Sequence, residues 1–192
     1  MTKAEWISVI QNTIKPGDEA EQYRAPFIER HLQSVYEQMY NELYRQDKQS
    51  IYQYLVKVTA TDSIGADLSV GYTMPSVPIS LPRVSGGVFE FSTTGRTYVL
   101  TDRKGYNNVA NTLFDTAGFK GQYVAYIDAT KIYANNTNTA GNIMTWYMIP
   151  KLTSLTTSSE VKIPGGMEDH FIDRVIDTIQ HTPPVDLMND NA

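Results

Sequence analysis

Three histidines are the residues of this 192-residue chain whose type best suits acid–base catalysis or metal binding. They are His31, His170 and His181, and no two of them have a ligand spacing that would place both on one metal ion. His31 falls on the apolar side of a predicted helix, which favours a hydrogen-bonded histidine in a core or interface. His170 and His181 are expected at the surface. The histidines therefore predict neither a catalytic site nor a metal site.

A row of carboxylates is the second candidate for chemistry. Asp169, Asp173 and Asp177 recur every four residues, so they share one face of a predicted helix. Such a row could bind a cation or act as an acid–base set. It lacks the loop carbonyls and the turn glycine of a calcium-binding loop. A solvated helix face is therefore the preferred interpretation.

A tyrosine row has the same spacing. Tyr36, Tyr40 and Tyr44 lie one helical turn apart and could stack on nucleobases or form a stripe that contacts a partner. They also border the apolar face of their helix, so packing at the edge of the core is the simpler interpretation. Both interpretations remain open at the level of sequence.

Motifs for phosphate binding and nucleophilic catalysis are absent from the sequence. Ser85-Gly86-Gly87 is not followed by Lys-Ser or Lys-Thr, so it is not a phosphate-binding loop. No Gly-x-Ser-x-Gly turn occurs, and no set of Ser, His and Asp residues can be nominated. We therefore assign no catalytic, cofactor-binding or metal-binding residue, and we expect a protein that is not an enzyme and needs no cofactor.

The composition and the charge argue against further classes of function and kinds of site. The formal charge is −5 and no Lys/Arg cluster is present, which argues against a protein whose main task is to grip nucleic acid. Cysteine is absent, so disulfides and thiolate metal sites are excluded. The chain contains 13 tyrosines, an aromatic type that suits contact surfaces. No signal-peptide core and no apolar run of membrane-spanning length is visible, so we expect a soluble protein made in the cytoplasm.

Apolar periodicity predicts three helices. The first begins near Trp6 and ends before Pro16, and the second covers residues 26–45. The third covers residues 168–180, begins with acidic residues that suit the positive end of a helix dipole, and ends before Pro183. The residues at helical spacing are Trp6, Val9, Ile10 and Ile14; Phe27, Ile28, His31, Leu32, Val35, Tyr36, Met39, Tyr40 and Leu43; and Phe171, Ile172, Val175, Ile176 and Ile179.

Short β-rich runs between turn residues fill the middle of the chain. Residues 51–61 could be helical at first, but they are predicted as a strand because their later part alternates with β-branched residues. Residues 72–82 contain three prolines that cannot donate to a sheet, so this segment should lie along an edge or reach outward. Residues 135–142 are polar and are expected to form a flexible tip. The remaining predicted strands are residues 88–91, 97–100, 123–127, 131–133 and 143–149.

The predicted fold class is α+β, with N-terminal helices, a central antiparallel β insertion that forms a small sheet or sandwich, and a C-terminal helix followed by an extended arm. We expect one domain over residues 1–192, in which the terminal helices pack on one another. Its predicted parts are a helical part at residues 1–48 and 164–182, a β lobe at residues 50–160 and an extended arm at residues 183–192.

Four features carry a resemblance to a known family and together cover most of the chain. They are the long helix at residues 27–45, the proline-punctuated residues 72–82 that lead to Gly86-Gly87-Val88, the Ile163-Pro164-Gly165-Gly166 entry to the last helix, and the tail at residues 186–191. In this order of parts the chain resembles the head-tail ring or adaptor proteins of short-tailed bacteriophages, in particular the ring proteins stacked beneath the portal in crAss-like phages. These are architectural patterns, and none is a catalytic signature.

The resemblance implies a structural virion protein of the head-tail connector or tail. Such a protein forms a homo-oligomeric ring, twelvefold to match the portal, and links the portal to neighbouring ring or tail proteins. DNA passes through the ring without sequence-specific binding, the β lobe faces outward or toward the tail, and no membrane is involved. The chain has no distinct basic stripe for DNA, which suits a channel through which DNA must slide. The aspartate row could then repel DNA or pair with basic residues of a neighbouring subunit.

A ring of identical subunits needs a heterologous interface, in which one face of each chain meets a different face of the next. We expect the helices at residues 27–45 and 168–180 to build this interface and residues 183–192 to lie on the portal or a neighbouring ring. The alternative is a carbohydrate- or surface-binding β module of a phage tail, with tyrosines and Trp146 as stacking platforms. The residues expected at subunit or portal interfaces are Tyr36, Tyr40, Tyr44, Phe171, Val175, Val185, Leu187 and Met188.

Overall fold

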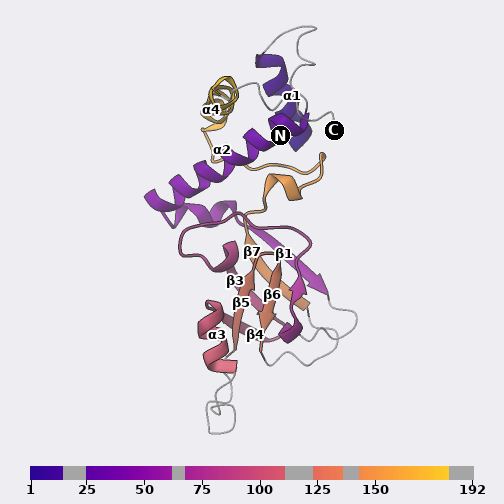
Figure 1. Cartoon of the computed structure of the whole chain (residues 1–192), viewed down its shortest axis with the longest axis vertical. Helices are drawn as coiled ribbons and strands as arrows, with labels where there is room; N and C mark the ends of the chain where they lie inside the picture. Colours follow the sequence, from indigo (N-terminus) through magenta and orange to yellow (C-terminus); the bar gives the residue numbers. More distant parts are fainter. Residues whose placement is uncertain (15–24, 62–67, 111–122, 136–142, 182–192) are drawn as a thin grey trace. The chain divides into compact units, whose positions relative to one another are not determined.

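The computed structural model divides the chain into two compact units (Figure 1). The helical unit comprises Met1–Gln46 and Leu152–Ala192, and the β unit comprises Asp47–Lys151. Helices at both ends of the chain with strands between them confirm the predicted α+β fold class. The residues that the structure describes are 1–14, 25–61, 68–110, 123–135 and 143–181.

Three α-helices dominate the helical unit. Helix α1 covers Lys3–Ile14, α2 covers Ala25–Gln46 and α4 covers Glu168–Gln180, and a short 3-10 helix, η6, covers Leu152–Ser154. The three α-helices pack against one another, as their apolar stripes predicted. The structure confirms the predicted bounds of the second and third helices to within one residue.

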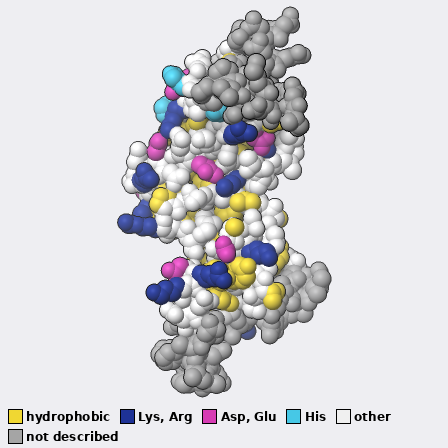
Figure 2. All heavy atoms as spheres, viewed as in Figure 1, with side chains coloured by type: hydrophobic (Ala, Val, Ile, Leu, Met, Phe, Trp, Pro, Cys, Tyr) yellow, Lys and Arg dark blue, Asp and Glu magenta, His cyan; other side chains and the backbone are white. Residues whose placement is uncertain are grey.

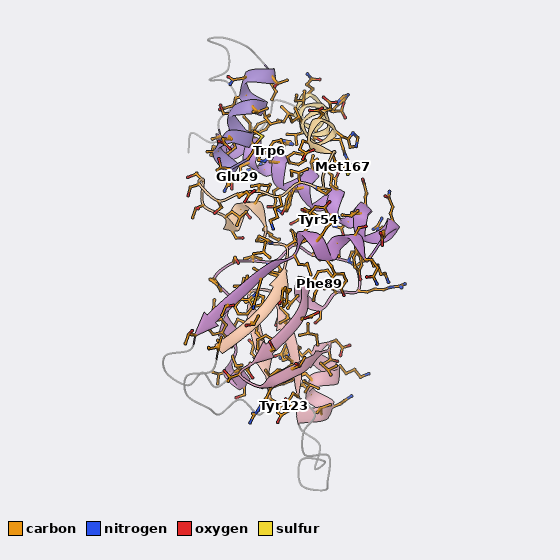
Figure 3. The ribbon with its side chains drawn as sticks, turned by 180° about the vertical axis from the view of Figure 1, so that it is seen from behind. Trp6, Glu29, Tyr54, Phe89, Tyr123 and Met167 are labelled. Atoms are coloured by element: carbon orange, nitrogen blue, oxygen red, sulfur yellow. The ribbon has the colours of Figure 1, made fainter. Side chains whose placement is uncertain are left out.

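The core of the helical unit forms where these apolar faces meet. Trp6 of α1 meets Phe171 of α4 edge to face, with ring centres 5.2 Å apart. Figure 3 labels the side chain of Trp6 in the helical unit. Phe171 and Val175 are both 0% exposed. The Tyr40 hydroxyl donates a 2.8 Å hydrogen bond to the backbone carbonyl of Lys162, which holds the segment before α4 against α2. Both ends of the chain therefore contribute to one core.

The described part of the β unit contains one curled sheet of seven strands in the spatial order β1-β7-β3-β4-β5-β6-β2. All its pairs are antiparallel except β4 and β5, which are parallel. This pair departs from the predicted antiparallel sheet, because a helical crossover joins the two strands. The strands are β1 Val56–Thr61, β2 Tyr72–Thr73, β3 Val88–Thr93, β4 Arg96–Leu100, β5 Val124–Asp128, β6 Lys131–Ala134 and β7 Ile143–Met148.

The crossover contains helix α3, Arg103–Ala110, which the sequence pattern did not predict. The Asp102 carboxylate caps its start by accepting a 2.6 Å hydrogen bond from the Gly105 N–H. Tyr106 of α3 packs on Val124 and Tyr126 of β5, so α3 covers part of one face of the sheet. This contact makes a second, smaller core in the β unit.

The main core of the β unit lies on the opposite, inner face of the sheet. Trp146 sits near its centre and is 0% exposed. Along β7 the inward residues alternate with residues of the outer face, as a half-buried strand requires. The buried members of this core are Leu68, Met74, Val88, Phe91, Tyr98, Ala125, Ile127, Ile132, Ala134, Met144, Trp146 and Met148.

The proline-punctuated segment lies along the chain that follows β7. The Ile79 N–H donates to the Ile149 carbonyl at 2.8 Å, and the Lys151 N–H donates to the Val77 carbonyl at 2.7 Å. Residues other than proline therefore make these bonds, as the lack of an N–H on proline requires. The buried side chains of Ile79 and Leu81 show that the segment does not reach outward.

The predicted strand at residues 51–61 is shorter in the structure. Its first part is a 3-10 helix, η2, at Ser50–Tyr54, and only β1 is extended. The expected flexible tip lies outside the described residues except for Asn135, and so does the expected arm at residues 183–192.

Candidate functional site

The structure buries the five described residues that were expected at interfaces. Tyr36 and Tyr40 are 3% and 1% exposed, Tyr44 is 9% exposed, and Phe171 and Val175 are fully buried. The rings of Tyr36 and Tyr40 meet each other at 4.8 Å, and burial raises the pKa of the Tyr36 hydroxyl. A buried side chain offers no surface to a partner, so packing in the core describes these positions better than an interface stripe.

Val185, Leu187 and Met188, the other residues expected at interfaces, lie outside the described residues.

The described histidines and the aspartate row are not arranged as a metal-binding site. His31 is buried and its ring lies 4.6 Å from that of Phe27. His181 is exposed, and its Nδ1 lies 3.2 Å from a carboxylate oxygen of Asp177. Within the part of the chain that the structure describes, no cluster of His, Asp or Glu side chains could hold a metal ion.

One charged cluster joins α2 to α4. The Arg174 guanidinium donates to both carboxylate oxygens of Glu42, at 2.8 and 3.0 Å, and to the Gln38 side-chain carbonyl at 3.2 Å. These hydrogen bonds and the positive charge of Arg174 lower the pKa of Glu42 below its ordinary value of 4.5. The arrangement is a two-pronged clamp between helices on a partly exposed surface.

We expect Arg174→Met to lower the free energy of unfolding of the helical unit by about 0.5–1 kcal/mol at pH 7, a small effect because the pair is solvent-screened. Since the folded-state pKa of Glu42 is lowered, its contribution is complete above pH 4.5 and is lost as the pH falls through the folded value. Urea unfolding between pH 3 and 7 would therefore show the variant converging on the wild type at low pH. Asp173→Asn, an exposed charge change on the same helix, is the control, and equal pH profiles for wild type and Arg174→Met would contradict the prediction.

A second ion pair fixes the start of the chain. The Lys3 ammonium lies 2.6 Å from a carboxylate oxygen of Glu29 and donates a 3.0 Å hydrogen bond to the Leu155 carbonyl. The Lys3 side chain is 7% exposed and that of Glu29 is 26% exposed. This pair ties α1, α2 and the segment after η6 together, which is a structural role.

The Ser85-Gly86-Gly87 turn also has a structural role. Gly86 and Gly87 have φ values of +55° and +74°, which L side chains rarely adopt. A side chain at Gly86 would overlap Ile127, and one at Gly87 would overlap the Ile79 carbonyl oxygen. The two glycines are therefore required by close packing at the start of β3.

Trp146 cannot serve as the exposed stacking platform that the β-module interpretation expected. It lies in the inner core, with its ring edge-on to that of Tyr72 at 6.2 Å. Its place follows from the alternation of β7, which turns Trp146 inward and its neighbours Thr145 and Tyr147 outward. Two of the tyrosines, Tyr106 of α3 and Tyr126 of β5, are likewise buried, where α3 packs on the sheet.

The outer face of the sheet presents a row of hydroxyl groups across four adjacent strands. Thr59 of β1 pairs with Thr145 of β7, Thr145 with Ser92 of β3, and Ser92 with Thr97 of β4. Thr59 and Thr97 are exposed, and the two central residues are half-buried. We name these four residues the hydroxyl row. Such a row can donate and accept hydrogen bonds, as a polar ligand or a second protein surface would require.

A mixed row lies beside the hydroxyl row. Lys57 of β1 pairs with Tyr147 of β7, and Tyr147 pairs with Glu90 of β3. Lys57 and Glu90 are exposed, while Tyr147 is half-buried. Charges of opposite sign therefore stand at the two ends of this row.

Strand β1 is the first strand in the order of the sheet, and among the described residues one of its edges is open. It pairs with β7 on one side, and no other described residue hydrogen-bonds to its backbone. None of its six residues is buried, so the open edge is accessible among the described residues. An unpaired strand edge offers N–H and C=O groups to a further strand.

Charge on the visible surface is dispersed. Figure 2 shows Lys and Arg side chains spread over the face with acidic side chains between them. Among the described residues, no helix is both long and apolar enough to cross a membrane.

The sequence contained the signal for a strand with an outer face, but the neighbours of that strand were not visible in it. The alternation of residues 56–61 predicted a strand, yet alternation does not tell which strands lie beside it or whether it ends the sheet. Only the register shows that Thr59, Ser92 and Thr97, far apart in sequence, share one row.

Comparisons with known proteins add no relative. No model of a known protein family matches the chain, and a search of curated proteins found no similar sequence.

Proposed function

We propose that this chain is a structural subunit of a homo-oligomeric ring in the head-tail connector or tail of a short-tailed bacteriophage. In this role it links the portal to neighbouring ring or tail proteins and surrounds the DNA channel without sequence-specific binding. The ring is twelvefold to match the portal, and the protein acts by assembly and not by catalysis.

The observation that supports this proposal is the construction of the chain. Both chain ends form one helical core, and the β unit is inserted between them. This is the order of parts on which the resemblance rests. The open edge of β1 gives such a subunit a surface for a contact with another chain that differs from the surfaces of its helices, as a heterologous ring interface requires.

The direct test is the copy number of the chain in purified particles of the phage that encodes it, measured by quantitative mass spectrometry against the portal. A ratio near one, or a small whole multiple, supports a place in the ring stack. Absence from particles would rule out the ring.

Removal of residues 185–192 is expected to abolish docking to the portal or to a neighbouring ring and to leave the fold intact. Co-sedimentation with portal measures docking, and circular dichroism measures folding. Loss of folded protein on deletion would contradict this prediction.

A second candidate function is a carbohydrate- or surface-binding β module of a phage tail. The hydroxyl row favours it, because hydroxyl side chains on an accessible sheet face can exchange hydrogen bonds with a sugar. The loss of Trp146 as a platform counts against it. Copies in large excess over the portal, or located at the tip of the tail, would favour this function over the ring.

A further inference from the structure

The open edge of β1 specifies the chemistry of a strand that could add to it. Val56, Val58 and Ala60 are half-buried on the core side of the sheet, while Lys57 and Thr59 are exposed on the outer face. A matching strand needs apolar residues at alternate positions toward the core, where they would cover Val56 and Val58. It also needs an acidic group on the outer side, opposite Lys57.

The C-terminal tail of this chain contains such a pattern. In the C-terminal tail, Asp186 stands between Val185 and Leu187, so a strand at this point would turn both apolar residues to one side and the carboxylate to the other. The tail follows the end of α4 at Gln180 and reaches Ala192, a length of chain that lies outside the described residues after 181. Pro183 and Pro184 precede the pattern and disfavour continuation of the helix.

We propose that residues 185–188 of one copy add as a strand to the β1 edge of a neighbouring copy. The inference rests on the proposed ring function and names the contact that joins its subunits. With Asp186 opposite Lys57, the residues on either side of Asp186 fall opposite Val56 and Val58 in both the parallel and the antiparallel orientation. The backbone of the tail completes the hydrogen bonds of the open edge, and the side chains fix the register.

A second copy of β1 is the competing occupant, and charge distinguishes the two. When two β1 strands pair antiparallel about a residue of their middle part, Lys57 falls opposite Thr59, Thr61 or a second Lys57, and never opposite an acid. The tail places a carboxylate there. Opposite charges on directly facing strand positions are favourable and like charges are unfavourable, so the tail fits the edge better.

The test uses the full chain and a synthetic peptide of residues 182–192 that carries a fluorophore. Val185→Asp together with Leu187→Asp in the full chain disables its own tail with either charge at residue 57, because the tail loses the apolar residues that would cover Val56 and Val58. Fluorescence anisotropy then measures binding of the wild-type peptide. Adding Lys57→Glu should weaken this binding at least about fivefold, because an attraction becomes a repulsion. A peptide that carries Asp186→Lys should bind in the opposite order, more tightly to the chain with Lys57→Glu.

Lys131→Glu is the matched control, since Lys131 is exposed on β6 and makes the same charge change away from β1. It should leave peptide binding unchanged, and circular dichroism should be the same for all variants. Failure of the peptide to bind, or equal binding to both charge states at Lys57, would overturn the inference. Self-association of the full chain without peptide binding would also overturn it and would favour another contact between copies.

The result is independent of the copy number in particles. If the chain is absent from particles but the two peptides bind with the expected opposite preferences for Lys57 and for Lys57→Glu, the ring is refuted and the strand contact stands. If the copy number matches the portal but the peptides show no such preference, the strand contact is refuted and the ring stands.

Discussion

Replacing Phe171 by alanine is expected to lower the free energy of unfolding of the helical unit by about 3–5 kcal/mol. Phe171 is fully buried and its ring meets Trp6 edge to face, so the substitution removes an aromatic side chain and leaves a cavity between α1 and α4. The surrounding helices are held by other contacts and can collapse only in part, which places the effect at the large end for a single substitution.

The two tryptophans make this effect measurable unit by unit. Trp6 lies in the helical unit and Trp146 in the β unit. Fluorine NMR of the protein labelled with 5-fluorotryptophan should therefore show the Trp6 signal unfolding at lower urea in the variant. Ile172→Ala, a half-buried position beside Phe171 on α4, should lower the stability by about 1 kcal/mol.

The same experiment separates a core residue from an interface residue. A side chain that serves only contacts between subunits would leave the stability of the isolated chain unchanged and would weaken self-association alone. Unchanged urea unfolding of the monomer in Phe171→Ala would therefore contradict the role in the core and return this residue to the interface.

Local patterns in the sequence predicted many of the helices and strands, because the apolar residues of these elements are strongly periodic. The last helix was predicted from its first to its last residue, since acidic residues start it, an apolar face runs along it and Pro183 follows it. Helix α3 was missed because Gly105, Asn107 and Asn108 are poor helix formers. Its stability comes from the Asp102 cap and from packing on β5, and only the cap has a signature in the sequence.

The candidate site was less predictable than the fold. Tyrosines at helical spacing look the same whether they face a core or a partner, and burial decided between these interpretations for Tyr36 and Tyr40. The parallel pair of β4 and β5, and with it the strand order that leaves β1 at an edge, depends on contacts between residues far apart in the chain. No pattern within one segment reports such contacts.

The Gly86-Gly87 pair shows how a motif can be recognised and its reason missed. In the sequence it could be tested only as a phosphate-binding loop, which the following residues exclude. In the structure each glycine combines a positive φ with a close approach to another segment. The close approach is a tertiary contact, so its effect on stability can be separated from that of the backbone angle alone.

Gly87→Ala is expected to destabilise the β unit by about 2–5 kcal/mol. The native backbone would hold the new alanine at a left-handed φ angle, which costs an L residue about 1–2 kcal/mol. It would also overlap the Ile79 carbonyl oxygen and lie 2.9 Å from Cβ of Pro78. Since Ile79 is tied to the Ile149 carbonyl by its own N–H, the backbone can yield only by disturbing that bond, and overpacking of this kind adds about 1–3 kcal/mol.

Gly95→Ala is the matched control, because Gly95 has nearly the same φ, +73°, and a Cβ added there would meet no described atom within 4 Å. It shares the backbone penalty with Gly87→Ala and lacks the overlap, so it should destabilise the β unit by only about 1–2 kcal/mol. Urea unfolding followed by the Trp146 fluorine signal measures both variants. Equal destabilisation would mean that the segment at residues 78–79 moves aside freely, and the close contact would then play no part in holding the proline-punctuated segment beside β3.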